Sequence, residues 1–254
     1  MTWLSYSLVA ALAFVLEVID ASFGMGYGTI LTPAMLMLGF DALQVVPAVI
    51  ASQLVGDFLA VFFHHQFKNV DMSVGSQHFR VGSMLAAFSL VGSIAAVLFA
   101  LKLSKFALNL YIGVLVVIVG VVVLATGEKA RDFSWLRLLF LGSIASFNKG
   151  LSGGGYGPVV TGGQILTGVD ARAAIGITSL AEGVTCIAAV LTYLFSGKTI
   201  DWSLAFALAI GVALSTPVAA AVVRKLESKY LKLIIGVFTL LLGILTVFKT
   251  IRVL

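Results

Sequence analysis

The chain has 254 residues, 60% of them hydrophobic and 11% charged, and its mean hydropathy is +1.12. So little polar surface excludes a water-soluble protein of this length and leaves no room for a separate soluble catalytic domain. The net charge of +5 comes from basic residues spread over short loops, so it does not indicate a nucleic-acid partner. We therefore predict an all-α integral membrane protein that lies in the lipid bilayer.

Apolar runs of about 18 residues or more predict transmembrane helices. The start of the chain, Met1 to Ser5, lacks the basic region of a signal peptide, so none is expected. In chain order we predict about eight transmembrane segments, two of them interrupted by glycines: 4–21 with 28–38, 43–63, 81–101, 106–126, 135–149 with 157–167, 173–195, 203–223 and 231–248.

The two interruptions belong to an internal repeat. The stretch Phe23-Gly24-Met25-Gly26-Tyr27-Gly28-Thr29 matches Ser152-Gly153-Gly154-Gly155-Tyr156-Gly157-Pro158, which lies 129 residues later. The same offset aligns 39–42 with 168–171, and one more residue aligns 68–71 with 198–201. We predict one integrated transmembrane domain made of two repeats, 1–127 and 128–254. A duplicated unit with a broken helix in each half is typical of secondary transporters.

The interrupted segments decide the predicted topology. The run 28–38 is only eleven residues, roughly 16 Å as a helix, too short for a hydrocarbon core of about 30 Å. If each broken segment crosses once, the loop lysines and arginines divide eight against seven. If each is re-entrant, they divide ten against five, which obeys the positive-inside rule. We therefore predict re-entrant first helices, inverted repeats and both termini outside the cytoplasm.

Irregular backbone at membrane depth indicates a cavity, because it must be covered by protein or reached by water. Half-helices that begin near Gly28 and Gly157 would point their N-termini into that cavity, where free N–H groups and the helix dipole favour an anion. Isolated glycines also serve close helix packing, but the density of glycine after Ser152 favours a break. The candidate substrate-binding residues of the breaks are Gly24, Gly26, Tyr27, Gly28, Ser152, Gly153, Gly154, Gly155, Tyr156 and Gly157.

Five ionisable residues lie within apolar stretches, where they usually mark a transport pathway. They are Glu17, Asp20, Asp57, Lys149 and Glu182. Asp20 aligns with Lys149 at the repeat offset, so an ion pair between them is one prediction, and substrate binding by Lys149 is the other. The four carboxylates are candidate coupling or ion-pair groups, some of them protonated, with Glu182 the first candidate proton carrier. Asp57 has the alternative of facing water near a helix end.

Other polar residues are expected near the same cavity. Asn148 adjoins Lys149, and Thr178 and Ser179 begin a long helix, so we include all three among the substrate-binding candidates. Gln53 and Gln164 are secondary candidates. Single Ser and Thr residues in membrane helices often bond their own backbone instead.

With these features the chain resembles the sulfite exporter TauE/SafE family of membrane permeases. The resemblance spans the whole length and rests on the paired stretches 24–28 and 153–157, on Thr178-Ser179, and on Lys198 to Trp202. It implies an eight-span protein of the bacterial inner membrane that moves a small sulfur-containing anion, such as sulfite or an organosulfonate, generally outward. The chain has Met25 and Thr29 where its second repeat has Gly154 and Pro158, so the half-sites need not contribute equally.

Two other functional classes are less consistent with the sequence. An intramembrane serine hydrolase would need a base for Ser152, but the three histidines, His64, His65 and His78, all precede it and lie near a loop. A transporter of a cation or neutral solute would use the carboxylates for binding.

The sequence does not indicate a metal site. The adjacent His64 and His65 point to different faces of a helix, and the single Cys186 cannot complete a set of ligands. We expect no cofactor and no bound metal, and the sequence leaves the oligomeric state open.

Overall fold

The computed structural model describes residues 3–24, 26–125, 135–166, 169–223 and 228–252. Over these residues the chain is helical, with no strand. The helices are α1 (Trp3–Phe23), α2 (Tyr27–Met37), α3 (Ala42–Gln66), α4 (Gln77–Ala100), α5 (Lys105–Ala125), α6 (Trp135–Ser152), α7 (Tyr156–Leu166), α8 (Ala171–Phe195), α9 (Trp202–Val222) and α10 (Ser228–Arg252). The predicted fold class, an all-helical membrane protein, agrees with this architecture. Met25, Gly168 and the proposed repeat boundary at 127/128 lie outside the described residues.

The landmarks shared by the two halves of the sequence are helix starts. Asp41 caps α3 by accepting a hydrogen bond from Leu43 N (3.0 Å), and Asp170 caps α8 by accepting from Arg172 N (3.0 Å). Asp201 caps α9 in the same way, through Leu204 N at 3.0 Å. A short acidic side chain at this position satisfies amide groups that the first turn leaves unbonded. The aspartate pair Asp41 and Asp170 therefore marks equivalent helix starts in the two halves. The second pair differs, because Asp201 caps α9 whereas α4 is capped by Ser76 rather than by Asp71.

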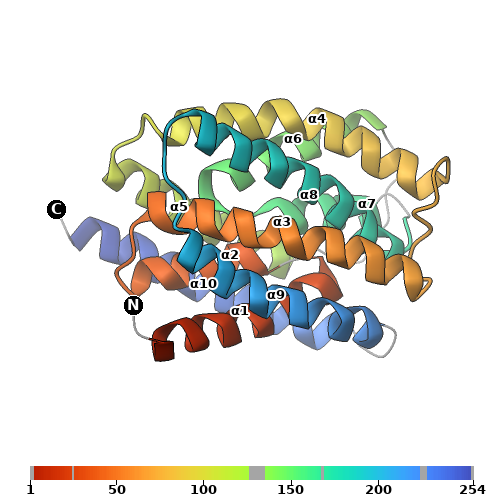
Figure 1. Ribbon diagram of the computed structural model, residues 1–254, viewed down its shortest axis with the longest axis horizontal. Helices are drawn as coiled ribbons and strands as arrows, with labels where there is room; N and C mark the ends of the chain where they lie inside the picture. Colours follow the sequence, from red (N-terminus) through yellow and green to blue (C-terminus); the bar gives the residue numbers. More distant parts are fainter. Residues whose placement is uncertain (1–2, 25, 126–134, 167–168, 224–227, 253–254) are drawn as a thin grey trace.

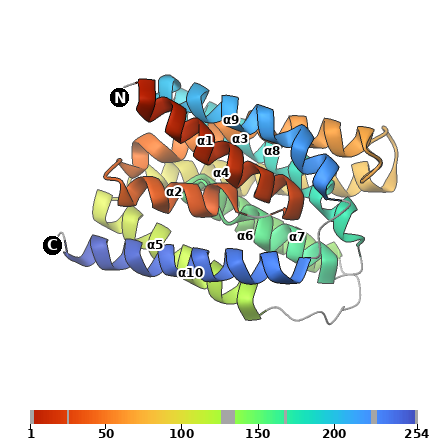
Figure 2. The ribbon, with the colours of Figure 1, turned by 90° about the horizontal axis from the view of Figure 1, so that it is seen from below.

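The glycine stretches reverse the direction of the chain. Gly24 and Gly153 both have positive φ, 67° and 73°, which residues with side chains rarely adopt. Figures 1 and 2 show α2 running back toward the end where α1 begins. The second half repeats the order of long helix, glycine break and short helix, and α2 and α7 each have 11 residues. The first broken segment is thus a hairpin, as the re-entrant alternative predicted.

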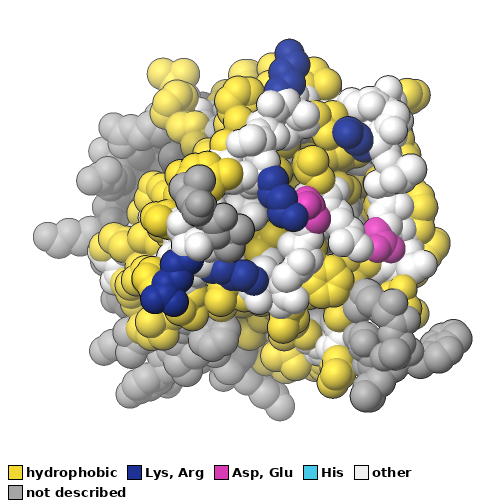
Figure 3. Space-filling view, turned by 90° about the vertical axis from the view of Figure 1, so that its left-hand side faces the viewer, with side chains coloured by type: hydrophobic (Ala, Val, Ile, Leu, Met, Phe, Trp, Pro, Cys, Tyr) yellow, Lys and Arg dark blue, Asp and Glu magenta, His cyan; other side chains and the backbone are white. Residues whose placement is uncertain are grey.

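The start of α1 and the end of α10 lie at the same end of the helix bundle, which we call the end that holds the termini. The loops that follow α2, α4 and α8 lie there too, whereas the loop between α3 and α4 lies at the opposite end (Figure 1). Figure 3 views the end that holds the termini, where basic and acidic side chains lie among apolar ones. Lys105 pairs with Asp41 there, with 2.8 Å between Nζ and Oδ2. This hydrogen bond from Lys105 lowers the pKa of the Asp41 carboxyl.

Helices from the two halves of the chain are interleaved. Helix α1 packs along α9, α4 packs along α6, and α3 packs against both α8 and α9. The α5–α10 pair lies along one side of the bundle and contacts α2 (Figure 2). Among the six helices that are long and apolar enough to cross a membrane, α3 and α8 are the most enclosed, with 61% and 78% of their most apolar 18-residue stretch buried. Polar residues on these two helices are therefore held inside the protein.

Six of the described helices are long and apolar enough to cross a membrane: α1, α3, α4, α5, α8 and α9. Helices α6 and α10 have 18 and 25 residues but are not among these six. Large apolar side chains face outward, such as Val91 at 75% and Phe206 at 65% exposure. Such a surface suits lipid rather than water. The chain is a multi-pass membrane protein, and the count of eight spans stays a prediction.

Candidate anion site at the helix breaks

The two glycine breaks lie directly against each other at the centre of the protein. A Cβ atom added to Gly28 would lie 1.7 Å from Gly153 O, and one added to Gly154 would lie 2.5 Å from Thr29 N. Gly155 N donates a hydrogen bond to Thr29 Oγ1 at 2.9 Å. Backbone can approach this closely only because Gly28 and Gly154 have no side chain at these points. The structure therefore brings together the glycines that the sequence singled out in separate halves.

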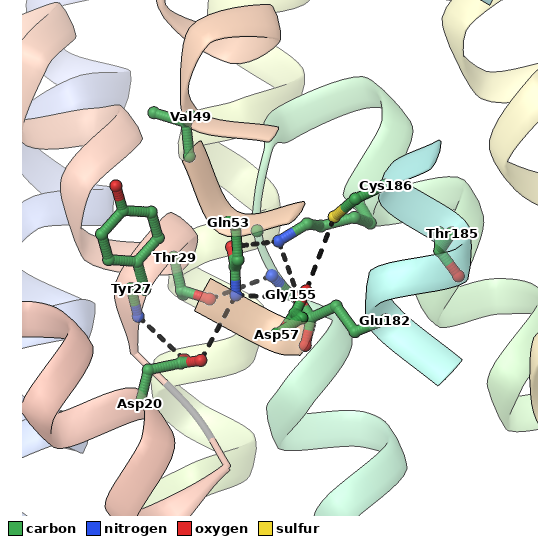
Figure 4. A network of polar contacts seen from close by, with 12 residues as sticks. Asp20, Tyr27, Thr29, Val49, Gln53, Asp57, Gly155, Glu182, Thr185 and Cys186 are labelled. Carbon is green, nitrogen blue, oxygen red and sulfur yellow. Dashed lines mark hydrogen bonds and ion pairs between the residues drawn. The ribbon is translucent and has the colours of Figure 1, made fainter. Parts of the chain in front are cut away.

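Lys149, in the last turn of α6, is fully buried beside these breaks. Its Nζ lies 2.7 Å from Glu182 Oε1 on α8, and it also donates to Gln53 Oε1 on α3. The sequence proposed Asp20 as its ion-pair partner, but the structure gives that place to Glu182. The reason is that Asp20 turns toward the backbone of α2, where its Oδ1 accepts from Tyr27 N at 3.0 Å. Figure 4 shows this network.

Gln53 links the charged groups, a role that sequence reasoning underrated. Its Nε2 donates to Asp20 Oδ2 (3.3 Å) and to Glu182 Oε1 (3.2 Å), while its Oε1 accepts from Lys149. The side chain is 1% exposed. A signal was present in the sequence: Gln53 and Glu182 are 129 residues apart, which is the repeat offset. Equivalent positions in two related halves meet when they lie close to the axis that relates those halves.

The two half-helix N-termini differ in what they bind. The first amide of α2, Tyr27 N, is bonded to the Asp20 carboxylate. The amides that lead into α7 are bonded to hydroxyl oxygens, Gly154 N to Ser152 Oγ (3.1 Å) and Gly155 N to Thr29 Oγ1 (2.9 Å). A carboxylate already neutralises the positive end of α2, whereas neutral hydroxyls leave the end of α7 able to attract an anion. The site is therefore asymmetric, with Lys149 and α7 as its electropositive side.

Two further carboxylates are buried close to the network. Asp57 is 2% exposed on α3, and its Oδ2 lies 3.7 Å from Cys186 Sγ. The alternative that Asp57 faces water near a helix end is therefore wrong, because α3 packs against α8 along its length. Glu17 is 1% exposed, and its Oε2 has no hydrogen-bond partner in the described part of the chain. An ionised carboxylate in such surroundings is strongly disfavoured.

The remaining candidates bond other partners than Lys149, Gln53 and Glu182. Tyr27 and Tyr156 bond Ser52 (2.7 Å) and Ser89 (2.9 Å) through their hydroxyls, and the ring of Tyr27 points away from Asp20 in Figure 4. Asn148 Oδ1 accepts from Tyr111, and Ser152 and Ser179 bond carbonyls of their own helices.

Thr178 accepts hydrogen bonds from Thr161 and Gln164. Gly24 accepts from Thr161 through its carbonyl, and Gly26 and Gly157 are buried within the breaks.

A separate cavity of about 330 Å³ lies between α2, α5 and α10, and its walls include Phe40, Lys105, Asn109 and Lys249. No residue of the Lys149 network lines it. The network itself is enclosed, since Gln53, Lys149 and Glu182 are each at most 4% exposed. In the conformation described here, an anion reaches Lys149 only if helices move.

No cluster of three or more His, Cys, Asp or Glu residues that could hold a metal ion occurs in the part of the chain that the structure describes. The only cysteine, Cys186, is buried and unpaired with another cysteine.

Comparison with known proteins agrees with this architecture. The model of the family described as Sulfite exporter TauE/SafE matches residues 9–246. The chain belongs to this family. Membership places it among membrane transporters rather than enzymes, and Ser152, with no histidine bonded to it, is consistent with that. The Bacillus subtilis (strain 168) "Probable membrane transporter protein YtnM" is 26% identical over 241 residues, which cover 89% of this chain and 77% of YtnM. No solved structure matches the chain significantly.

Proposed function

We propose that this TauE/SafE protein is a secondary transporter of a small sulfur-containing anion, such as sulfite or an organosulfonate, working in the outward direction. One observation carries the proposal: a fully buried lysine, Lys149, lies beside the glycine break that leads into α7, where the amides of Gly154 and Gly155 are bonded to hydroxyl oxygens. An anion with several oxygens suits this pair of donors, because a cation and a helix N-terminus both stabilise spread negative charge.

The proposed mechanism is an exchange of counter-ions. Glu182 is the anion that Lys149 holds in the absence of substrate. A substrate oxyanion would take its place at Lys149 and at the amides of Gly154 and Gly155. Glu182 would then lie buried without its cation, a state that favours the protonated acid. Binding of one anion would therefore take up one proton, and the two would move together.

The helix packing supports two inverted repeats around this site. By the repeat offset, α1 of the first half corresponds to α6 of the second half, and α4 corresponds to α9. Helix α1 packs along α9, and α6 packs along α4, so each of these contacts is the equivalent of the other. Rocking of one repeat against the other would expose Lys149 to each side in turn. We assign the end where α1 begins and α10 ends to the outside of the bacterial inner membrane, because the re-entrant arrangement gives that side five of the loop lysines and arginines in the sequence and the other side ten.

A cation or neutral solute is the second candidate. Glu17 and Asp57 are buried and Asp20 is partly buried, and none of the three carboxylates has an ion-pair partner in the described chain. If they rather than Lys149 bind the substrate, substitution of Lys149 would leave selectivity unchanged.

The test is counterflow in proteoliposomes with sulfite, sulfoacetate, taurine, sulfate and small carboxylates, with and without a pH gradient. We expect selective uptake of a sulfur oxyanion that Lys149→Gln abolishes and that Lys102→Gln, a change at an exposed loop residue, leaves intact. Uptake of a cation instead, or normal anion uptake by Lys149→Gln, would contradict the proposal.

A further inference from the structure

Two matched hydrogen bonds hold the helix segments that lead into the breaks. On α3, His64 Nε2 lies 2.8 Å from Ala21 O, near the end of α1. On α8, Tyr193 Oη donates to Gly150 O, near the end of α6, over 3.4 Å. His64 and Tyr193 are 129 residues apart, and so are Ala21 and Gly150. The two contacts occupy equivalent places in the two halves, and each acts three residues before the first glycine of a break.

The first contact extends to a third helix. Asn69, in the loop after α3, donates through Nδ2 to His64 Nδ1 (3.1 Å) and to Ala220 O on α9 (3.1 Å). His64 is 0% exposed and Asn69 is 6% exposed. Ala21, Ala60 and Ala219 form a small cluster here, which allows α1, α3 and α9 to approach closely. We call His64, Asn69 and their two carbonyl partners the His64 latch.

The His64 latch requires one protonation state of its imidazole. Ala21 O can only accept, so Nε2 must carry a hydrogen, and the amide group of Asn69 donates, so Nδ1 must be bare. A doubly protonated ring has two donors and no acceptor. Its Nδ1–H would face the NH₂ of Asn69, and rotation of that amide would turn Oδ1 toward Ala220 O, which also only accepts. Protonation therefore breaks the link to α9. The tyrosine of the second contact does not titrate near neutral pH.

We propose that His64 is a positioning residue that makes the release of α1 from α9 dependent on cytoplasmic pH, while Tyr193 holds α6 in a pH-independent way. His64 is in the last turn of α3 and Asn69 is in the loop between α3 and α4. Figure 1 shows this loop at the end opposite the termini, which the proposed topology assigns to the cytoplasm. Acid on that side opens the first repeat next to the glycine break. The inference rests on the proposed function only for this sidedness and for its effect on transport.

The residues around His64 make its own protonation the simplest cause of a pH-dependent opening of the latch. His64 forms no ion pair in the described chain. Helix α9 carries no titratable residue between Trp202 and Val222. Besides His64, the charged or titratable groups on α1, on α3, in the loop and at the start of α4 are Tyr6, Glu17, Asp20, Asp57, His65, Lys68, Asp71, His78 and Arg80.

The test reads the latch without measuring transport. In a Cys186→Ala background, Ser22→Cys places a thiol next to Ala21, at a buried side chain (4% exposed) whose oxygen has no partner among the described residues. Maleimide labelling of the purified full chain is measured at several pH values and divided by the rate in the unfolded chain at the same pH. We expect the ratio to rise at least about fivefold from about pH 8 to about pH 5.5.

Two variants separate the latch from a general effect of acid. His64→Gln keeps a donor for Ala21 O but cannot be protonated, and Asn69→Leu keeps His64 but removes the group that requires a bare Nδ1. Both should give a ratio that no longer depends on pH, whereas Tyr193→Phe should keep the full acid response. If His64→Gln or Asn69→Leu responds to acid as the unmodified background does, the proposal is overturned. Failure of anion counterflow with an intact labelling response would instead contradict the proposed function alone.

Discussion

Gln53 Nε2 donates a hydrogen bond of 3.2 Å to Glu182 Oε1 across the interface of α3 and α8, although 129 residues separate the two in the chain. Both side chains also contact Lys149. The only buried ion pair in the described chain is therefore shared with a neutral amide that reaches both halves of the protein. Because the repeat offset relates these two residues, the centre of the site lies where equivalent positions meet.

Gln53→Leu is expected to reduce both stability and transport. The substitution keeps the volume but removes one hydrogen bond from Lys149 and one from Asp20, which keep only Glu182 and Tyr27 N as partners. A hydrogen bond to a charged group contributes about 1.5–3 kcal/mol. We expect a lower melting temperature in detergent and a loss of counterflow of at least about tenfold. Gln44→Leu is the matched control, since Gln44 bonds Asp201 in a partly exposed contact. Equal effects of the two changes would contradict a central role for Gln53.

Gly28→Ala is expected to disrupt the contact between the breaks. The added Cβ would lie 1.7 Å from Gly153 O, so the backbone of one break must move, and overpacking of this kind costs about 1–3 kcal/mol or more. Gly162→Ala in α7 is the control, because nothing lies within 4 Å of its Cβ position, and alanine there is expected to stabilise the helix by about 0.5–1 kcal/mol. Thermal unfolding of both variants checks this. Equal stability of the two would mean that the breaks separate easily.

Glu182→Gln is expected to uncouple anion movement from protons. It removes the anion that competes for Lys149, so anion exchange should persist while a pH gradient no longer drives uptake. Leaving a buried lysine uncompensated costs about 3–5 kcal/mol, so the variant should also be less stable unless substrate is present. Counterflow with and without a pH gradient, and melting with and without the anion, measure both effects. Uptake that still follows the pH gradient would exclude Glu182 as the proton carrier.

Glu17→Gln is expected to have the opposite effect on stability. Its carboxyl has one buried oxygen without a partner in the described chain, and Asp20 lies on the same face of α1, three residues away. A neutral amide of the same size cannot take on the charge that this buried site disfavours, so the melting temperature should stay equal or rise. A marked fall would show that Glu17 forms a contact on which the fold depends.

The Asp41–Lys105 pair is expected to contribute little and only above acidic pH. The hydrogen bond from Lys105 lowers the pKa of Asp41, so its stabilisation is present above the unfolded-state pKa and is lost as the pH falls through the lower folded value. Both side chains are substantially exposed, 66% for Lys105 and 40% for Asp41, so the pair contributes less than about 1 kcal/mol. Lys105→Gln should lower the melting temperature slightly at about pH 7 and not at about pH 2. A difference that persists at the lower pH would have another origin.

Much of the fold was predictable because it depends on local sequence. The expected spans 43–63 and 173–195 lie within α3 and α8, and the short runs 28–38 and 157–167 match α2 and α7 to within one residue. Hydrophobic runs, glycines with positive φ and aspartate caps act on their own neighbours in the chain, so they can be identified without knowing the fold.

The tertiary structure alone decided which charges and hydroxyls meet. The repeat placed Asp20 and Lys149 at matching positions, but Lys149 pairs with Glu182, and Asp20 caps the backbone at Tyr27. Tyr27 and Tyr156 looked like substrate ligands, yet both hydroxyls bond serines on neighbouring helices. These choices depend on how each helix is rotated about its axis and on how closely α3 and α8 approach. Both are set by the packing of all the helices together, which no single segment of the sequence encodes.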